Sequence, residues 1–133
     1  MQVTAIVKNS ATGHEVLVRT GNADQALSVP PKSSGKGSAI NGGEFLMLAL
    51  ATCYCNDLYR EAERLGVPIE GVEVEARAEF PGIGLAAVNI TYRATVSSSA
   101  SNAAIAQLLR ETDAVAEIHN TIRAGVPVEL VRR

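Results

Sequence analysis

One segment, residues 41–66, constrains the fold of this chain more than any other. Between Phe45 and Tyr54 nearly every side chain is apolar, and acidic or basic residues return only from Asp57. A surface helix needs one polar face, so a helix of this composition must be enclosed on all sides. The run is also far shorter than the roughly 20 apolar residues that cross a bilayer. We therefore predict a long, buried central helix and no membrane span.

The sequence also marks the two ends of this helix. Asn41 can accept a hydrogen bond from a free amide of the first turn, and Glu44 can reach back to the Asn41 amide. Together they form a capping box with Asn in the first position. Gly66 and Pro68 are residue types that end a helix. We therefore predict that the helix begins near residue 41 and ends near residue 66.

The remaining segments predict strands and two shorter helices. Alternation of apolar and polar side chains indicates strands, and a repeat near 3.6 residues indicates amphipathic helices. The predicted strands are residues 3–7, 15–19, 26–29, 72–80, 88–96 and 126–130, and the predicted shorter helices are residues 100–111 and 113–124. The short glycine-bearing connection at 81–87 predicts an antiparallel hairpin of the fourth and fifth strands. Thr112 is a possible start for the last helix, and Gly125 is placed to cap it.

This order of elements predicts an α+β fold. Strand groups that are segregated from long helices argue against a doubly wound parallel sheet. At 133 residues and 47% hydrophobic content, the chain is sized for a single domain, residues 1–133. A chain of this length has limited material to surround ten consecutive apolar helix residues. Burial against a second copy solves that problem, so we expect a homodimer.

Composition argues against several classes of partner. Twelve basic residues stand against fourteen acidic ones, and only 4% of residues are aromatic. The chain therefore offers neither a cationic surface for phosphates nor a stacking platform for bases, and we expect no nucleic-acid partner. The first residues lack a basic segment followed by an apolar one, which predicts a cytoplasmic protein.

The two cysteines, Cys53 and Cys55, lie at the midpoint of the predicted helix. Two residues of separation place them about 200° apart around the helix axis, so their side chains diverge and do not form a disulfide. His14 and His119 lack the close spacing of zinc ligands, and we expect no metal site. A reactive thiol needs a nearby cation or hydrogen-bond donor, for which Arg60 is one candidate. The alternative is a pair of inert thiols that fill space in the core.

Two segments resemble a known family. The sequence Gly42-Gly43-Glu44-Phe-Leu-Met-Leu-Ala-Leu-Ala-Thr-Cys53, and the later Glu63-Arg-Leu-Gly66-Val-Pro-Ile-Glu-Gly-Val-Glu-Val-Glu75, resemble the osmotically inducible protein C (OsmC) and organic hydroperoxide resistance family. The order of elements is similar to that family across nearly the whole chain. The resemblance implies an OsmC-like domain in an intertwined homodimer with its sites at the interface. It also implies that Cys53 attacks the peroxide and that Glu44 matches the glutamate at the start of the helix.

The chain departs from the family pattern at two functional positions. The family's resolving cysteine falls at Ala116 here, which implies that no intramolecular disulfide of the family type forms. The activating arginine of the hydroperoxide-resistance branch falls near His14. A protonated His14 or Arg60 is a possible substitute, and His119 is a possible donor or base. The alternatives are a solvated surface position for His14 and a partly exposed helix position for His119.

These observations lead to one main functional expectation and two alternatives. We expect a thiol-dependent peroxidase that reduces organic or small hydroperoxides through Cys53. It would use no cofactor. An external thiol, or a cysteine of the paired chain, would regenerate it because Cys55 is badly aimed. The first alternative is a non-catalytic homodimer that is redox-responsive or binds a small apolar ligand. The second is a purely structural dimer with inert thiols.

Overall fold

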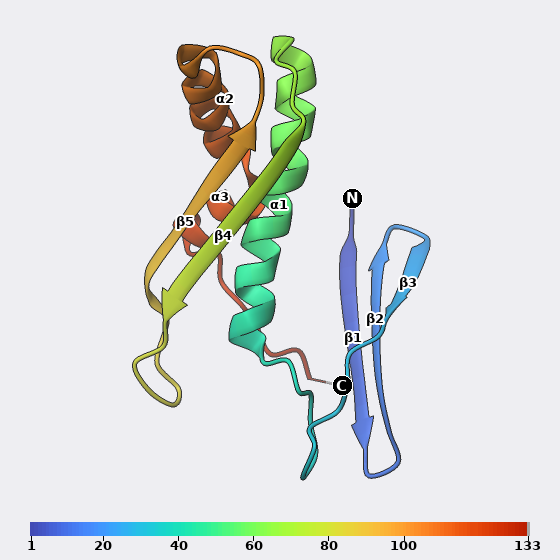
Figure 1. Cartoon of the computed structure of the whole chain (residues 1–133). Coiled ribbons are helices and arrows are strands. Elements are labelled where there is room, and N and C mark those ends of the chain that lie inside the picture. The colour runs from blue at the N-terminus through green and yellow to red at the C-terminus, as the bar shows by residue number, and fades with distance from the viewer. Residues whose placement is uncertain (133) are drawn as a thin grey trace. The chain divides into compact units, whose positions relative to one another are not determined.

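The computed structural model describes residues 1–132 and has an α+β fold (Figure 1). Its elements in chain order are β1 (Val3–Ser10), β2 (Gly13–Thr20), β3 (Ala23–Leu27), α1 (Gly42–Leu65), β4 (Gly71–Glu79), β5 (Val88–Ser97), α2 (Asn102–Val115) and α3 (Glu117–Ala124). The chain divides into two compact units, Met1–Phe45 and Leu46–Arg133, and each is described by itself.

The first unit contains a three-stranded antiparallel sheet in the order β1-β2-β3. This confirms the predicted N-terminal strands, although β3 begins three residues before the predicted start. Side chains alternate between the two faces of a strand, so Val3, Val7 and Leu27 share one face in the observed register. All three are exposed, Val3 by 65%. The sheet therefore has an apolar face that this chain leaves open to solvent.

Helix α1 begins and ends as predicted. The Asn41 N–H donates to Glu44 Oε1 at 3.0 Å, and the Glu44 N–H donates to Asn41 Oδ1 at 2.8 Å, which completes the capping box. At the other end Gly66 adopts a φ of 69°, a left-handed conformation that glycine accepts without steric cost. The Val67 N–H then bonds the Ala62 carbonyl at 2.8 Å, which satisfies a free carbonyl of the last turn.

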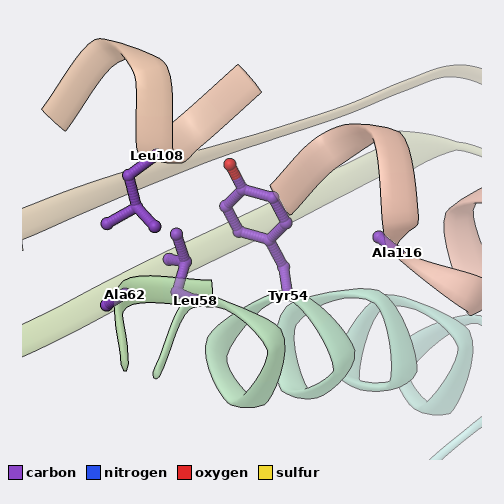
Figure 2. Close-up of a cluster of buried hydrophobic side chains, with 5 residues drawn as sticks. All are labelled: Tyr54, Leu58, Ala62, Leu108 and Ala116. Atoms are coloured by element: carbon purple, nitrogen blue, oxygen red, sulfur yellow. The ribbon is translucent and has the colours of Figure 1, made fainter. Parts of the chain in front are cut away.

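The core of the second unit lies along one face of α1. Figure 2 shows Tyr54, Leu58 and Ala62 on that face, with Leu108 of α2 directed toward Leu58. Ala116, between α2 and α3, completes this buried cluster. The hairpin residues packed against it are Val72, Val74, Tyr92, Ala94 and Val96. The predicted antiparallel hairpin is confirmed, since β4 and β5 pair antiparallel with Val74 opposite Ala94.

A single chain does not enclose the apolar half of α1 on all sides. Between Phe45 and Tyr54, only Leu50 and Tyr54 are buried, whereas Leu48 is 57% exposed. The hairpin and the two shorter helices supply side chains to only one face of α1. That face continues past the apolar run, which explains why the charged residue Asp57 is buried.

The C-terminal region differs from the prediction in two places. Thr112 does not start a helix but lies inside α2, where its buried hydroxyl donates to the Leu108 carbonyl at 2.7 Å. The break falls at Ala116, whose backbone is extended with φ −72° and ψ 107°. Gly125 caps α3 with a φ of 60°, as predicted.

The predicted final strand at 126–130 is also wrong. These residues form no strand, and Val128 and Leu130 are 98% and 95% exposed. Pro127 lacks an amide hydrogen, and a strand needs a neighbour that shares its hydrogen bonds. Within residues 1–132 no strand pairs with this segment.

Helix length and composition also bear on the membrane expectation. Among the helices of residues 1–132, none combines the length and the apolar content required to span a bilayer.

Candidate active site around Cys53

The half-buried Cys53 thiol lies beside two carboxylates. Its Sγ is 3.6 Å from Asp57 Oδ2, one turn later on α1, and 3.8 Å from Glu117 Oε2 on α3. The rest of the Cys53 side chain packs against the buried core. One side of the sulfur is therefore apolar, and another side faces charged oxygen atoms.

The start of α3 also affects this sulfur. The chain break at Ala116 allows α3 to begin at Glu117, and the backbone of Ile118 in its first turn lowers the pKa of the Cys53 thiol. Amide groups at a helix N-terminus favour negative charge, and such a position promotes a cysteine thiolate.

The net effect of these surroundings keeps the proton on the sulfur. Burial raises the pKa of Cys53 above its ordinary value, and the negative charges of Asp57 and Glu117 add to that rise. The Ile118 backbone lowers the pKa but does not outweigh these effects. The resting side chain is therefore a thiol whose proton has two carboxylate acceptors close by.

The two carboxylates form an unequal pair. Burial raises the pKa of Asp57, and the adjacent Glu117 raises it further. Glu117 hydrogen-bonds its own backbone amide at the start of α3, and this bond lowers the pKa of its carboxyl. Two close carboxylates disfavour simultaneous ionisation, so a proton in the pair resides mainly on Asp57.

Arg60 joins the cluster through these carboxylates. Its Nη1 is 3.0 Å from Asp57 Oδ1 and 3.6 Å from Glu117 Oε1, and its Nε is 3.4 Å from Glu61 Oε2. The guanidinium is half exposed. The predicted approach of Arg60 to the thiol is therefore indirect, since Arg60 contacts the oxygen atoms that surround the sulfur.

Two other predicted site residues have different surroundings. The Glu44 carboxylate accepts from the Asn41 amide in the helix cap. Cys55 is a free, half-buried thiol outside the core cluster that Cys53 contacts. Position i+2 on a helix directs it away from Cys53.

The two histidines lie in separate units. His14 is on β2, and its Nδ1 is 3.0 Å from the Asn9 amide nitrogen. His119 is only 3% exposed, so the alternative of a partly exposed helix position is wrong. Its ring centroid is 4.4 Å from that of Tyr92 and 5.8 Å from that of Tyr54. Within residues 1–132 neither ring nitrogen of His119 has a hydrogen-bond partner, and burial lowers the pKa of this imidazole.

The donor atoms of Cys53, Asp57 and Glu117 all lie within 4.8 Å of one another. That spacing would admit a small cation. Arg60 already provides a positive charge to both carboxylates, and we assign no metal to these side chains.

Sequence reasoning missed two members of this site. Asp57 follows Cys53 by four residues, so the helical i, i+4 rule could have paired them. Glu117 is 64 residues from Cys53 and is brought close by packing of α3. Its place at the start of α3 was not predicted either, because the last helix was expected to span residues 113–124.

Similar proteins are found both among curated proteins and among solved structures. Protein YmaD of Bacillus subtilis (strain 168) is 34% identical over 59 residues, which cover 44% of this chain and 39% of that protein. The OsmC-like protein of Mycoplasma pneumoniae aligns over 92% of this chain and 86% of that chain, with a TM-score of 0.65 and 17% identity. An organic hydroperoxide resistance protein OsmC of Legionella pneumophila aligns over 95% of this chain and 93% of that chain, with a TM-score of 0.58 and 21% identity.

At these identities the structural likeness establishes the fold alone. The family comparison goes further, because the match to the OsmC-like proteins covers residues 35–131, well over half of the chain. It includes α1, the β4–β5 hairpin and both shorter helices, and therefore every residue of the Cys53 cluster. The chain belongs to the OsmC-like protein family.

Proposed function

We propose that this protein is a thiol-dependent peroxidase that reduces organic or small hydroperoxides through Cys53. The observation that carries the proposal is the Cys53 sulfur itself, half-buried against the core and beside the first turn of α3, Asp57 and Glu117. The first turn of α3 can stabilise negative charge on this sulfur, and the two carboxylates can accept its proton. Two structural neighbours, from Legionella pneumophila and Jannaschia sp. CCS1, are described as hydroperoxide resistance proteins, which agrees with this chemistry.

The proposed reaction has a defined balance. The Cys53 sulfur attacks one peroxide oxygen, an S–O bond forms as the O–O bond breaks, and the products are a sulfenic acid and an alcohol. The sulfur is oxidised by two electrons and the peroxide is reduced. An external thiol then attacks the sulfenic acid with loss of water, and a second thiol releases Cys53 and a disulfide. An external thiol is needed because the fully buried Ala116 carries no sulfur in the region of the family's resolving cysteine.

We further propose that the functional unit is an intertwined homodimer. Three apolar surfaces support it: the open sheet face with Val3 and Val7, the exposed Leu48 on α1, and the C-terminal segment with Val128 and Leu130. Exposed apolar groups of this extent are typical of association surfaces. The C-terminal segment, which pairs with no strand among residues 1–132, also has the alternation of a strand.

The test is hydroperoxide consumption with a supplied dithiol. We expect the wild type and Cys55→Ser to consume cumene hydroperoxide catalytically in the presence of dithiothreitol, and Cys53→Ser to match the protein-free background. Equal rates for Cys53→Ser and the wild type, or no rate above background for either, would overturn the proposal.

A second candidate is a homodimer that binds a small apolar ligand without turnover. The observation that favours it is an open groove of about 460 Å³ whose apolar wall comes from Tyr54, Tyr92, Ala94 and Leu109. Saturable binding of cumyl alcohol, unchanged in Cys53→Ser and without peroxide loss in the wild type, would support this candidate.

A further inference from the structure

We infer that Asp57 and Glu117 form a proton relay for Cys53, taking the thiol proton and returning it to the departing alkoxide. This inference rests on the proposed peroxidase function and names the groups that move the proton.

Geometry carries the inference. Both carboxylates reach the reacting atom, since Asp57 Oδ2 and Glu117 Oε2 lie 3.6 and 3.8 Å from Cys53 Sγ. Their oxygen atoms and the sulfur fit within 4.8 Å of one another. The pair joins two environments, because the Asp57 side chain is 7% exposed and the Glu117 side chain is 67% exposed. A proton taken from the sulfur can therefore be held inside the site or exchanged at its surface.

The protonation states of the cluster agree with a relay. The raised pKa of Cys53 means that its proton must leave as the S–O bond forms. The pKa of Asp57 is raised towards neutral pH, and a group with a pKa near the working pH both accepts and donates protons effectively. The titratable groups that face the pair are Cys53 and Arg60 on α1. Arg60 keeps the pair from becoming an uncompensated negative charge.

The relay closes the proton balance of the first half-reaction. The thiol proton moves to a carboxylate as the sulfur attacks the terminal, hydrogen-bearing oxygen of the hydroperoxide. The O–O bond breaks, and the same proton passes from the carboxyl to the departing oxygen. The sum is a thiol plus a hydroperoxide giving a sulfenic acid plus an alcohol, and the carboxylate pair is unchanged.

The leaving group provides a test that a structural role would not mimic. Cumene hydroperoxide releases a strongly basic alkoxide that needs a proton, whereas a peroxycarboxylic acid releases a stable carboxylate that does not. We expect Asp57→Asn and Glu117→Gln each to slow single-turnover oxidation of Cys53 by cumene hydroperoxide by about 100-fold, the lower end of general acid–base contributions. Oxidation by 3-chloroperoxybenzoic acid should slow much less, by less than about 10-fold, because only the acceptor role is lost.

Two controls keep the test decisive. Glu63→Gln removes an exposed carboxylate elsewhere on α1 and should leave both rates unchanged. Glu117 is largely exposed, so Glu117→Gln remains informative if Asp57→Asn fails to fold. Equal slowing with both oxidants, or no slowing in either variant, overturns the relay while leaving the peroxidase proposal intact. A wild-type Cys53 that reacts with neither oxidant overturns both.

Discussion

Asp57 Oδ2 lies 3.6 Å from the Cys53 sulfur, one helical turn along α1. This i, i+4 pair places a carboxyl with a raised pKa against a thiol with a raised pKa. A pre-formed thiolate is the usual way to activate a cysteine, but here the proton has a nearby acceptor instead. The reactivity that we propose for Cys53 therefore depends on its neighbours during the reaction more than on its charge at rest.

Removal of the Tyr54 hydroxyl should weaken the core by a small, measurable amount. This hydroxyl donates to the Leu109 carbonyl at 2.7 Å and joins α1 to α2. We expect Tyr54→Phe to lower the free energy of unfolding by about 1 kcal/mol, because a buried acceptor loses its partner. Urea denaturation at one fixed protein concentration measures the change. Tyr59→Phe, on the exposed side of α1, is the matched control and should change stability by less than about 0.5 kcal/mol.

Truncation of Leu108 should cost much more. Leu108 is fully buried against Leu58 and the rest of the core. We expect Leu108→Ala to lower the free energy of unfolding by roughly 2–5 kcal/mol, because it removes buried methyl groups and leaves a cavity. Leu85→Ala tests the same chemical change at a position in the β4–β5 connection that is 59% exposed. Similar losses for the two variants in urea denaturation would contradict this description of the core.

His119 should make stability depend on pH below neutrality. Its pKa in the folded protein is lowered from the ordinary value of 6.5, chiefly by burial and also by Arg123. The other groups that face the ring are Asp113, which opposes the shift, and the rings of Tyr54 and Tyr92. In the window below pH 6.5 the unfolded chain binds more protons at this position, so stability rises with pH there.

The measurement is the free energy of unfolding between pH 5 and pH 8 for the wild type and His119→Phe. The stabilisation linked to a neutral His119 is fully present above about pH 6.5 and is lost as the pH falls through the lower pKa of the folded protein. We expect the wild type to lose stability more steeply than His119→Phe over that fall. Parallel curves for the two proteins would show that this imidazole is not held neutral by burial.

Association should depend on the exposed part of the central helix. Leu48 lies on α1 outside the covered face and is 57% exposed. We expect Leu48→Glu to raise the dissociation constant of the homodimer at least tenfold, about 1.4 kcal/mol, because a charge would replace buried apolar area. Analytical ultracentrifugation over a dilution series measures it. Ala103→Glu, an exposed change on α2, serves as the control, and a wild type that is monomeric throughout would contradict the proposed dimer.

Local signals predicted much of the fold. Asn41, Glu44 and Gly66 define the ends of α1 through short-range hydrogen bonds and backbone conformation, which depend on neighbours in the sequence. The same holds for the alternation that predicted β4 and β5. These features were predicted because each requires only a few adjacent residues.

The errors occurred where distant contacts decide the outcome. Thr112 was a reasonable helix start, but its buried hydroxyl bonds within α2, and the chain breaks at Ala116 instead. The segment at 126–130 has the pattern of a strand but no strand beside it within the described chain. Apolar alternation indicates which side chains seek burial, and it does not identify the surface that buries them.

Sequence reasoning named Cys53 and Arg60 as members of the candidate site but missed Asp57 and Glu117. Cys53 was identified from the family resemblance, and Arg60 as a candidate cation on the same predicted helix. Glu117 could not be foreseen, because its approach to Cys53 depends on the packing of α3 against α1 across 64 residues of sequence. The burial of His119 depends on the same packing against Tyr92.

The most direct measurement is the mass of the intact protein after treatment with one equivalent of cumene hydroperoxide, with no added thiol. Wild type and Cys55→Ser should each gain one oxygen atom, and dimedone should trap this product as a sulfenic acid adduct at residue 53. Cys53→Ser should keep its original mass. An unmodified wild type, or the same gain of oxygen in Cys53→Ser, would contradict the assignment of Cys53 as the peroxide-reactive residue.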